Sequence, residues 1–263
     1  MLYLGPSDPP AAQEPKVLLQ DRIAIVTGAA QGIGESIATF LATAGASVLL
    51  ADIQRGRVDE VARRLNAAGH RAASCCVDVR EPSSASAMVA SCLDEFGKVD
   101  VLINNAGIDA PPGAAWEVDE DHWRRVIDTN LSGAWWCTAA VLAPMKQQRS
   151  GRIVFISSGS ARIGDPDISV AYNASKAGLI GLTIGLSVHL EPFGILVNAI
   201  APGYTGTGEP MTVEERSAYD AAHPLGIVGP EPVARACLYL ASAGGDWITG
   251  AVLNVSGGWW RGW

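Results

Sequence analysis

The chain has 263 residues, 48% of them hydrophobic and 17% charged, which is enough material for a sizeable buried core. Its formal net charge is −8 and it has no basic cluster, which argues against nucleic acid or an anionic membrane surface as a partner. No apolar stretch reaches the length of a membrane span without interruption. Five scattered cysteines without a metal-binding pattern indicate reduced thiols in a cytoplasmic protein without a bound metal.

Residues 1–19 are rich in proline and alanine and predict a flexible N-terminal arm. They lack the basic start and apolar centre of a signal peptide, so we expect none. Residues 20–263 show no internal linker and no repeat of fixed period, which indicates one domain. The irregular stretch at about 203–230 is too long for an ordinary connection and is expected to form a substrate lid with short helices.

From residue 22 onward, short apolar runs rich in β-branched residues alternate with longer helical patterns. Nearly continuous apolar strands that alternate with helices predict a parallel sheet covered on both faces. The adjacent Cys75 and Cys76 fall in an expected strand and are interpreted as core residues. The expected strands cover 22–28, 47–53, 72–79, 99–107, 152–158, 195–202 and 251–258. Helical patterns include 34–45, 58–69, 82–97, 118–148 and 177–188.

The segment "VTGAAQGIGESIA" follows the first expected strand and opens the first helix. Gly28, Gly32 and Gly34 would let the backbone turn tightly and let a pyrophosphate approach the amides at the helix N-terminus. A glycine triplet by itself could also be a purely structural turn. Its position between a strand and a helix favours phosphate binding.

Asp52 ends the second expected strand. A carboxylate there can accept hydrogen bonds from a ribose diol and repels a 2′-phosphate, so it favours NAD over NADP. Gln31, before Gly32, brings no cation for a 2′-phosphate, whereas Arg55 and Arg57 lie near enough in sequence to soften the preference.

The segment "YNASK" places Tyr172 and Lys176 four residues apart at the start of an expected helix, on the same face. A tyrosine alone is a poor base at neutral pH, but a nearby lysine cation favours the phenolate. Such a pair can take the hydroxyl proton of an alcohol during oxidation, or give it back during reduction. A surface contact between the two side chains is the structural alternative.

Taken in order, these motifs resemble the short-chain dehydrogenase/reductase family in its compact form, over about residues 20–258. The further motifs are "DV" at 78–79, "NNAG" at 104–107, Asn130, "ISS" at 156–158, "PG" at 202–203 and "NVSGG" near the C-terminus. The resemblance implies an α/β fold: a single Rossmann-like, doubly wound domain with a seven-stranded parallel sheet and helices on both faces. It also implies hydride exchange between a nicotinamide and an alcohol or ketone, usually in a homotetramer.

The resemblance also implies catalytic roles. Tyr172 would be the general acid/base, and Lys176 would tune it and hold the nicotinamide ribose. Ser158 would bind the substrate oxygen, with Ser157 as its rival, and Asn130 would hold a water of a proton relay behind Lys176. Ser158 and Tyr172 are one residue further apart than is commonest in the family, which makes the substrate hard to infer by analogy.

The cofactor contacts implied by the resemblance run along the whole fold. The expected cofactor-binding residues are Gly28, Gln31, Gly32, Ile33, Gly34, Asp52, Ile53, Asp78, Val79, Asn105, Ala106, Gly107, Tyr172, Lys176, Pro202, Gly203, Thr205 and Thr207. Asp78 would meet the adenine, and Thr205 or Thr207 would lie near the carboxamide or the diphosphate.

The expected substrate residues are Ser160, Arg162, Tyr204 and Met211. Arg162 would favour an anionic substrate if it points inward, and is otherwise a solvated side chain. Trp259, Trp260 and Trp263 end the chain and could pack in a subunit contact, which the sequence favours, or line the pocket.

The leading interpretation is therefore an NAD-dependent oxidoreductase for a hydrophobic secondary alcohol or ketone. The alternative enzyme is a 3-oxoacyl-thioester reductase of the acyl-carrier-protein type, which usually goes with NADPH. A non-enzymatic nicotinamide sensor is a third interpretation, disfavoured by the presence of Asn130, Ser158, Tyr172 and Lys176 together.

Overall fold

The computed structural model describes residues 18–108, 115–163, 168–207, 212–222, 224–226 and 229–261. In these residues seven parallel strands form one sheet in the order β3-β2-β1-β4-β5-β6-β7, which confirms the predicted α/β class. The strands are β1 (Ile23–Thr27), β2 (Ser47–Asp52), β3 (Ala72–Cys76), β4 (Val101–Asn104), β5 (Gly151–Ile156), β6 (Ile195–Pro202) and β7 (Val252–Val255).

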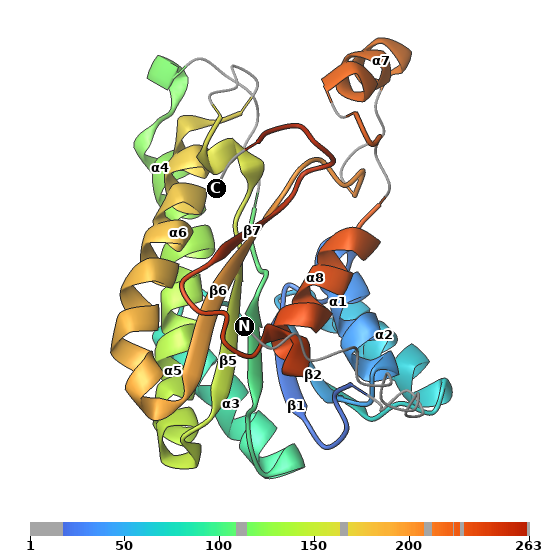
Figure 1. Ribbon diagram of the computed structural model, residues 1–263, viewed down its shortest axis with the longest axis vertical. Coiled ribbons are helices and arrows are strands. Elements are labelled where there is room, and N and C mark those ends of the chain that lie inside the picture. Colours follow the sequence, from blue (N-terminus) through green and yellow to red (C-terminus); the bar gives the residue numbers. More distant parts are fainter. Residues whose placement is uncertain are drawn as a thin grey trace, which may run out of the picture.

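Helices cover both faces of this sheet (Figure 1). One face carries α1 (Gly32–Thr43), α2 (Arg55–Ala67) and α8 (Glu231–Ala241). The other carries α3 (Pro82–Phe96), α5 (Gly133–Gln148) and α6 (Val170–Leu190). The shorter α4 (Glu120–Ile127) precedes α5 and lies at its N-terminal end. Helix α7 (Val213–Ala222) stands away from the sheet, above α8 in Figure 1. In the part of the chain that the structure describes, no helix combines the length and the apolar character that crossing a membrane requires.

Two apolar cores lie on the two sides of the sheet. Successive residues of a strand point to opposite faces, so Val26 packs with α1 and α8 while the neighbouring Ile25 packs with α3, α5 and α6. Both side chains are fully buried, as are those of β4. This double burial explains why the strands read as nearly continuous apolar runs.

The predicted helix over 118–148 is wrong in detail, because it is interrupted. Residues Asp128–Ser132 form a π-helical turn between α4 and α5, and the amide of Gly133 donates to the carbonyl oxygen of Asp128, five residues back. Close packing accompanies the turn, since a Cβ on Gly133 would lie 2.7 Å from Cγ2 of Val79. Such turns widen a helix locally and occur often at functional sites.

The interpretation of the cysteine pair as core residues is wrong for Cys76. Strand β3 is an edge strand, and its alternation places Cys75 against the core while Cys76 is exposed. All five cysteines are free thiols. At the start of the described chain, Leu19 is buried and its amide donates to the carbonyl oxygen of Ala44.

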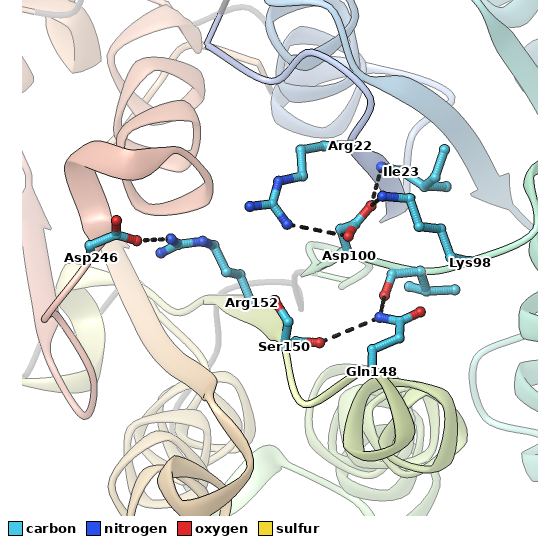
Figure 2. A network of polar contacts seen from close by, with 9 residues as sticks. Arg22, Ile23, Lys98, Asp100, Gln148, Ser150, Arg152 and Asp246 are labelled. Atoms are coloured by element: carbon cyan, nitrogen blue, oxygen red, sulfur yellow. Dashed lines mark hydrogen bonds and ion pairs between the residues drawn. The ribbon is translucent and has the colours of Figure 1, made fainter.

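Polar contacts tie together the strand ends that lie away from the carboxyl edge of the sheet (Figure 2). The buried carboxylate of Asp100 accepts hydrogen bonds from the amide of Ile23 at 2.8 Å and from Arg22, and pairs with Lys98 at 2.9 Å. Arg152 of β5 pairs with Asp246, which precedes β7. These contacts fix the amino ends of the strands and leave the carboxyl ends free to carry a site, as is usual in open α/β sheets.

Candidate active site

The loop between β1 and α1 has a backbone that only glycine accommodates at three points. Gly28 and Gly32 have φ angles of 65° and 58°, in the left-handed region. A Cβ on Gly28 would lie 2.8 Å from Cα of Ala106, and one on Gly34 would overlap the carbonyl oxygen of Gly28. The first amides of α1 therefore face an open cradle, which is an arrangement that binds phosphate.

A threonine and an asparagine join this loop to the end of β4. The Thr27 hydroxyl accepts hydrogen bonds from the amides of Asn105 and Ala106, both at 3.1 Å. The Asn105 side-chain amide donates to the carbonyl oxygens of Thr27 at 3.0 Å and Gly28 at 3.1 Å. The "NNAG" segment therefore braces the glycine loop from the neighbouring strand.

Asp52 lies at the carboxyl end of β2 and is 8% exposed. Its carboxylate accepts hydrogen bonds from the amide of Ala30 at 3.0 Å and from that of Gln54 at 2.9 Å. These bonds fix the carboxylate at the rim of the cradle. The nearby Gln31 accepts a 2.6 Å hydrogen bond from the guanidinium of Arg57, so a cation also stands beside this rim.

The segment after β3 brings a second carboxylate to the same edge of the sheet. Asp78 forms a double hydrogen bond with the guanidinium of Arg80, and this side-chain hydrogen bond lowers the pKa of Asp78 below its ordinary value. Arg125 and Thr129, one helical turn apart on α4 and the π turn, line the same cavity.

These segments enclose one cavity of about 800 Å³ at the carboxyl edge of the sheet. It contains both the cradle and the predicted catalytic residues Ser158, Tyr172 and Lys176. The other predicted residues that line it are Gly28, Gln31, Gly32, Ile33, Gly34, Asp52, Ile53, Asp78, Val79, Asn105, Ala106, Gly107, Pro202, Gly203, Tyr204, Thr205 and Thr207.

Lys176 lies on the first turns of α6 and is 5% exposed. Its ammonium donates a 2.9 Å hydrogen bond to the carbonyl oxygen of Ile156, at the end of β5, and lies 5.5 Å from the centre of the Tyr172 ring. The ring packs with Val126 of α4 and Ala171. The sheet and two helices thus hold the cation and the phenol on one side of the cavity.

The two serines after β5 point to different partners. Ser157 is buried and donates a 2.8 Å hydrogen bond to the carbonyl oxygen of Lys176, which commits it to the backbone of α6. The Ser158 oxygen accepts from the amide of Ser160 at 3.2 Å and from the Ser160 hydroxyl at 2.9 Å. A serine oxygen has two lone pairs, so the hydroxyl proton of Ser158 is left to donate elsewhere.

Asn130 lies in the π turn and is 1% exposed. Its side chain accepts from the amide of Ile108 at 2.8 Å, and donates to the carbonyl oxygen of Ile108 at 2.9 Å and to Ser175 at 3.1 Å. Ser175 in turn donates to the carbonyl oxygen of Tyr172 at 2.7 Å. Asn130 thus holds the segment after β4 against α6, and its role in a proton relay stays a prediction.

The predicted substrate residues are placed unevenly. Tyr204 lines the cavity, whereas Ser160 is buried, is not among the described residues that line the cavity, and donates its hydroxyl to Ser158. Arg162 is exposed and is not among the described residues that line the cavity. Met211 lies outside the described residues.

Ile108 and Ile168 line the cavity and lie in the stretches after Asn105 and after Ser158, which were expected to form the pocket, whereas Arg125 and Thr129 were missing from the sequence prediction. The i, i+4 spacing of Arg125 and Thr129 was the available signal, because it puts both on the helix face that carries the cavity wall. Trp259 also lines the cavity, and Trp260 is 7% exposed within its own chain. Trp259 thus has the cavity position that the sequence favoured less, a role of these tryptophans in a subunit contact stays a prediction, and Trp263 lies outside the described residues.

The residues present fit a dinucleotide. The glycine positions leave a cradle that any side chain would fill, the helix N-terminus supplies amides for phosphate, and Asp52 supplies a fixed carboxylate for a ribose diol. Beyond the cradle, Ser158, Tyr172 and Lys176 offer two hydroxyl groups and a cation to a reacting oxygen atom. The arrangement can move a proton to or from a small molecule at that end.

Comparison with known proteins gives one consistent result. A family model described as short chain dehydrogenase matches residues 22–219. The cis-4-hydroxycyclohexanecarboxylate dehydrogenase of Sinomonas cyclohexanicum is 42% identical over 91% of this chain and 96% of its own length. The 3-oxoacyl-(acyl-carrier-protein) reductase of Chlamydia trachomatis is 39% identical over 92% of this chain and 98% of its own length.

Solved structures agree with these sequences. The crystal structure of a short-chain type dehydrogenase/reductase from Mycobacterium marinum superposes with a TM-score of 0.86 at 31% identity. It covers 93% of this chain, and the match spans 97% of that chain.

Proposed function

Since the chain belongs to the short-chain dehydrogenase/reductase family, whose members are oxidoreductases that use nicotinamide cofactors, we propose that it interconverts a secondary alcohol and a ketone with NAD. One observation carries this proposal: Ser158, Tyr172 and Lys176 line the same cavity as the glycine loop and Asp52. A group suited to acid/base chemistry would thus stand at one end of the proposed dinucleotide site. The relative that is 42% identical is named for a substrate with a hydroxyl group on a cyclohexane ring, which is a secondary alcohol.

The bound nicotinamide would accept or donate the hydride, and the chain would handle the proton. In alcohol oxidation, the Tyr172 phenolate oxygen would take the hydroxyl proton of the substrate, and in ketone reduction the phenol would return it. The Lys176 ammonium, fixed by Ile156, would stabilise the phenolate form.

The role of Ser158 follows from its hydrogen bonds. Because the Ser160 amide and hydroxyl occupy its lone pairs, the Ser158 hydroxyl can act only as a donor toward the cavity. A donor at this point stabilises an oxygen atom that carries negative charge, as the reacting oxygen does during hydride transfer. Ser160 would therefore act as a positioning residue for Ser158.

The preference for NAD rests on Asp52, whose carboxylate is buried at the rim where a 2′-phosphate would lie. Arg57, held by Gln31, is the opposing influence at the same rim. We expect Asp52 to dominate, because the backbone amides fix it in place whereas Arg57 is exposed.

The test is nicotinamide absorbance during turnover, with NAD and NADP offered separately to a panel of cyclic, aromatic and aliphatic secondary alcohols. We expect turnover with NAD, its loss in Tyr172→Phe, and unchanged NADH binding in that variant. Asp52→Ala should narrow the preference for NAD over NADP. If the native protein prefers NADP, the proposed role of Asp52 in selecting NAD is wrong. If no alcohol and no corresponding ketone is turned over, the proposed alcohol–ketone reaction is wrong.

A second candidate is a 3-oxoacyl-thioester reductase, because a reductase of that class is 39% identical. This enzyme would reduce a β-keto thioester, and we would expect it to prefer NADPH. Assays with acetoacetyl-CoA and each reduced cofactor separate the two: rapid reduction with NADPH and negligible alcohol oxidation would favour the reductase.

We also propose a homotetramer in the cytoplasm, as the family resemblance and the reduced cysteines predict. An apolar groove between α5 and α6 supports self-association. It is lined by Leu131, Ser132, Trp135, Trp136, Gly178, Gly181, Leu182, Gly185 and Leu186. A Cβ on Gly178 would meet Leu131, but Cβ atoms on Gly181 and Gly185 would meet nothing within 4 Å. These two glycines cost helix stability without serving internal packing, and they would let a second helix approach closely.

Light scattering should therefore give the mass of four chains for the native protein, and a smaller mass for Gly181→Leu. A monomeric native protein would overturn the tetramer.

A further inference from the structure

Trp259, close to the end of the described residues, lies at one particular end of the cavity. Trp259 lines the cavity, and the six-membered part of its indole lies against Gly159, the residue after Ser158. This contact puts Trp259 next to the segment that carries Ser158, which follows β5, whereas Asp52 lies at the end of β2 and the strands β1 and β4 lie between the two. Ile108, Ile168 and Tyr204 line the cavity as well.

The segment 256–260 is anchored at several points. The Trp259 amide donates a 3.0 Å hydrogen bond to the carbonyl oxygen of Ser256, and the Asn254 side chain donates at 3.0 Å to that of Trp260. Trp260 is buried. The amide of Leu225, between α7 and α8, donates to the carbonyl oxygen of Gly257 at 3.0 Å. The main chain that carries Trp259 is therefore fixed to β7 and to the chain that returns from α7.

Gly159 is the counterpart of this segment. A Cβ on Gly159 would lie 2.8 Å from Cε3 and Cζ3 of Trp259 and 2.9 Å from Cδ1 of Trp260. Real Cβ atoms do not come this close, so any side chain at 159 would push the indoles away. The residue after Ser158 and the tryptophan pair thus fit each other, although a hundred residues of chain separate them.

We propose that Trp259 is the specificity-determining wall of the substrate end, and that it selects a secondary alcohol or ketone whose reacting carbon belongs to, or is attached to, a ring. The proposal rests on the proposed function. A flat indole face that is fixed by its backbone offers broad contact to a ring and little to a flexible chain, which must also lose conformational freedom to lie flat.

The test compares cyclohexanol with 2-hexanol, which have six carbons and one secondary hydroxyl each, under NAD turnover. In Trp259→Ala we expect kcat/KM for cyclohexanol to fall about tenfold relative to that for 2-hexanol, the loss that an aromatic contact of this kind implies. Trp259→Phe should keep most of the preference. Gly159→Ala should reproduce the selective loss, because it displaces the indole without removing it. Trp247→Ala, which removes a fully exposed tryptophan, should leave the ratio unchanged.

Equal losses for both alcohols in Trp259→Ala, or no loss, would overturn the wall while leaving the proposed function intact. Turnover of neither alcohol by the native protein would count against the proposed function instead. In that case calorimetric binding of cyclohexanone and 2-hexanone to the enzyme with NADH still decides the wall. Trp259→Ala should weaken the cyclohexanone complex about tenfold more than the 2-hexanone complex, and equal binding changes would refute it.

Discussion

The ammonium nitrogen of Lys176 lies 5.5 Å from the centre of the Tyr172 ring and is held there by a hydrogen bond to the last residue of β5. Both side chains come from α6, but the position of the ammonium group is fixed by its hydrogen bond to Ile156 of the sheet. The four-residue spacing therefore brings the pair to one helix face, and the strand end fixes their final geometry.

Replacing Lys176 with methionine removes its positive charge and keeps a side chain of similar length, so it tests the effect of the charge. Lys176→Met should lower kcat for alcohol oxidation by about a hundredfold or more at pH 7, because the phenolate loses its stabilising cation. The rate should recover in part as the pH is raised, since hydroxide then favours the phenolate. The pH–rate profile is the measurement, and Lys146→Met, an exposed lysine packed on Phe193, is the matched control. A variant profile that coincides in pH with the native one would contradict this role.

The two adjacent serines should fail in different ways. Ser158→Ala removes the donor toward the cavity and should lower kcat by about 10²-fold. It also removes the acceptor of the buried Ser160 amide and hydroxyl, so the free energy of unfolding should fall by about 1 kcal/mol as well. Ser157→Ala removes a buried hydrogen bond to α6 and should lower the free energy of unfolding by about 1 kcal/mol while kcat stays close to native. Urea denaturation and steady-state kinetics on both variants measure this division. If Ser157→Ala were the inactive variant, the assignment of the two serines would be reversed.

Two glycines give a test of the cradle. Gly34→Ala should abolish NADH binding, because its Cβ would overlap the carbonyl oxygen of Gly28. Gly56→Ala, on α2 where a Cβ meets nothing within 4 Å, should keep NADH binding and raise stability by at most about 1 kcal/mol. Fluorescence titration with NADH compares the two. Native affinity in Gly34→Ala would show that the cradle is not the phosphate site.

Only one of the five thiols should react quickly with a disulfide reagent at pH 8. Burial raises the pKa of Cys75, Cys92 and Cys137 to about 12 and that of Cys237 still further, so these four stay protonated. Cys76 is exposed. Titration of the folded protein should count one fast thiol, and titration after denaturation five. Cys76→Ser should remove the fast reaction, and a second fast thiol in the folded protein would contradict the buried environments.

Local signals explain what could be predicted from the sequence. The strands, the glycine loop and the Tyr172–Lys176 pair depend on residues close together in the chain, whose periodicity and spacing are visible directly. The choice between Ser157 and Ser158 stayed open, because it depends on which face of β5 meets α6. That contact lies nineteen residues away in sequence.

Features that depend on distant contacts were predicted only as open alternatives or not at all. Trp259 reaches the cavity only because Gly159 leaves room for it. The π turn has no characteristic amino-acid pattern by which the sequence could reveal it. In the structure it accompanies the close packing of Gly133 on Val79. Cys76 looks like a core residue until β3 is known to be the edge of the sheet.

The π turn also means that the site depends on residue count and not on residue identity alone. One extra residue in a helix rotates everything before it by about 100° relative to everything after it. Deleting any single residue from 128–132 would restore a regular pitch and swing α4 round its axis. His122 would then lose its 3.0 Å contact with Ser169, and Val126 its packing on Tyr172. The helical register on either side of 128–132 is therefore part of the site, and deleting one residue there should harm the site more than most substitutions would.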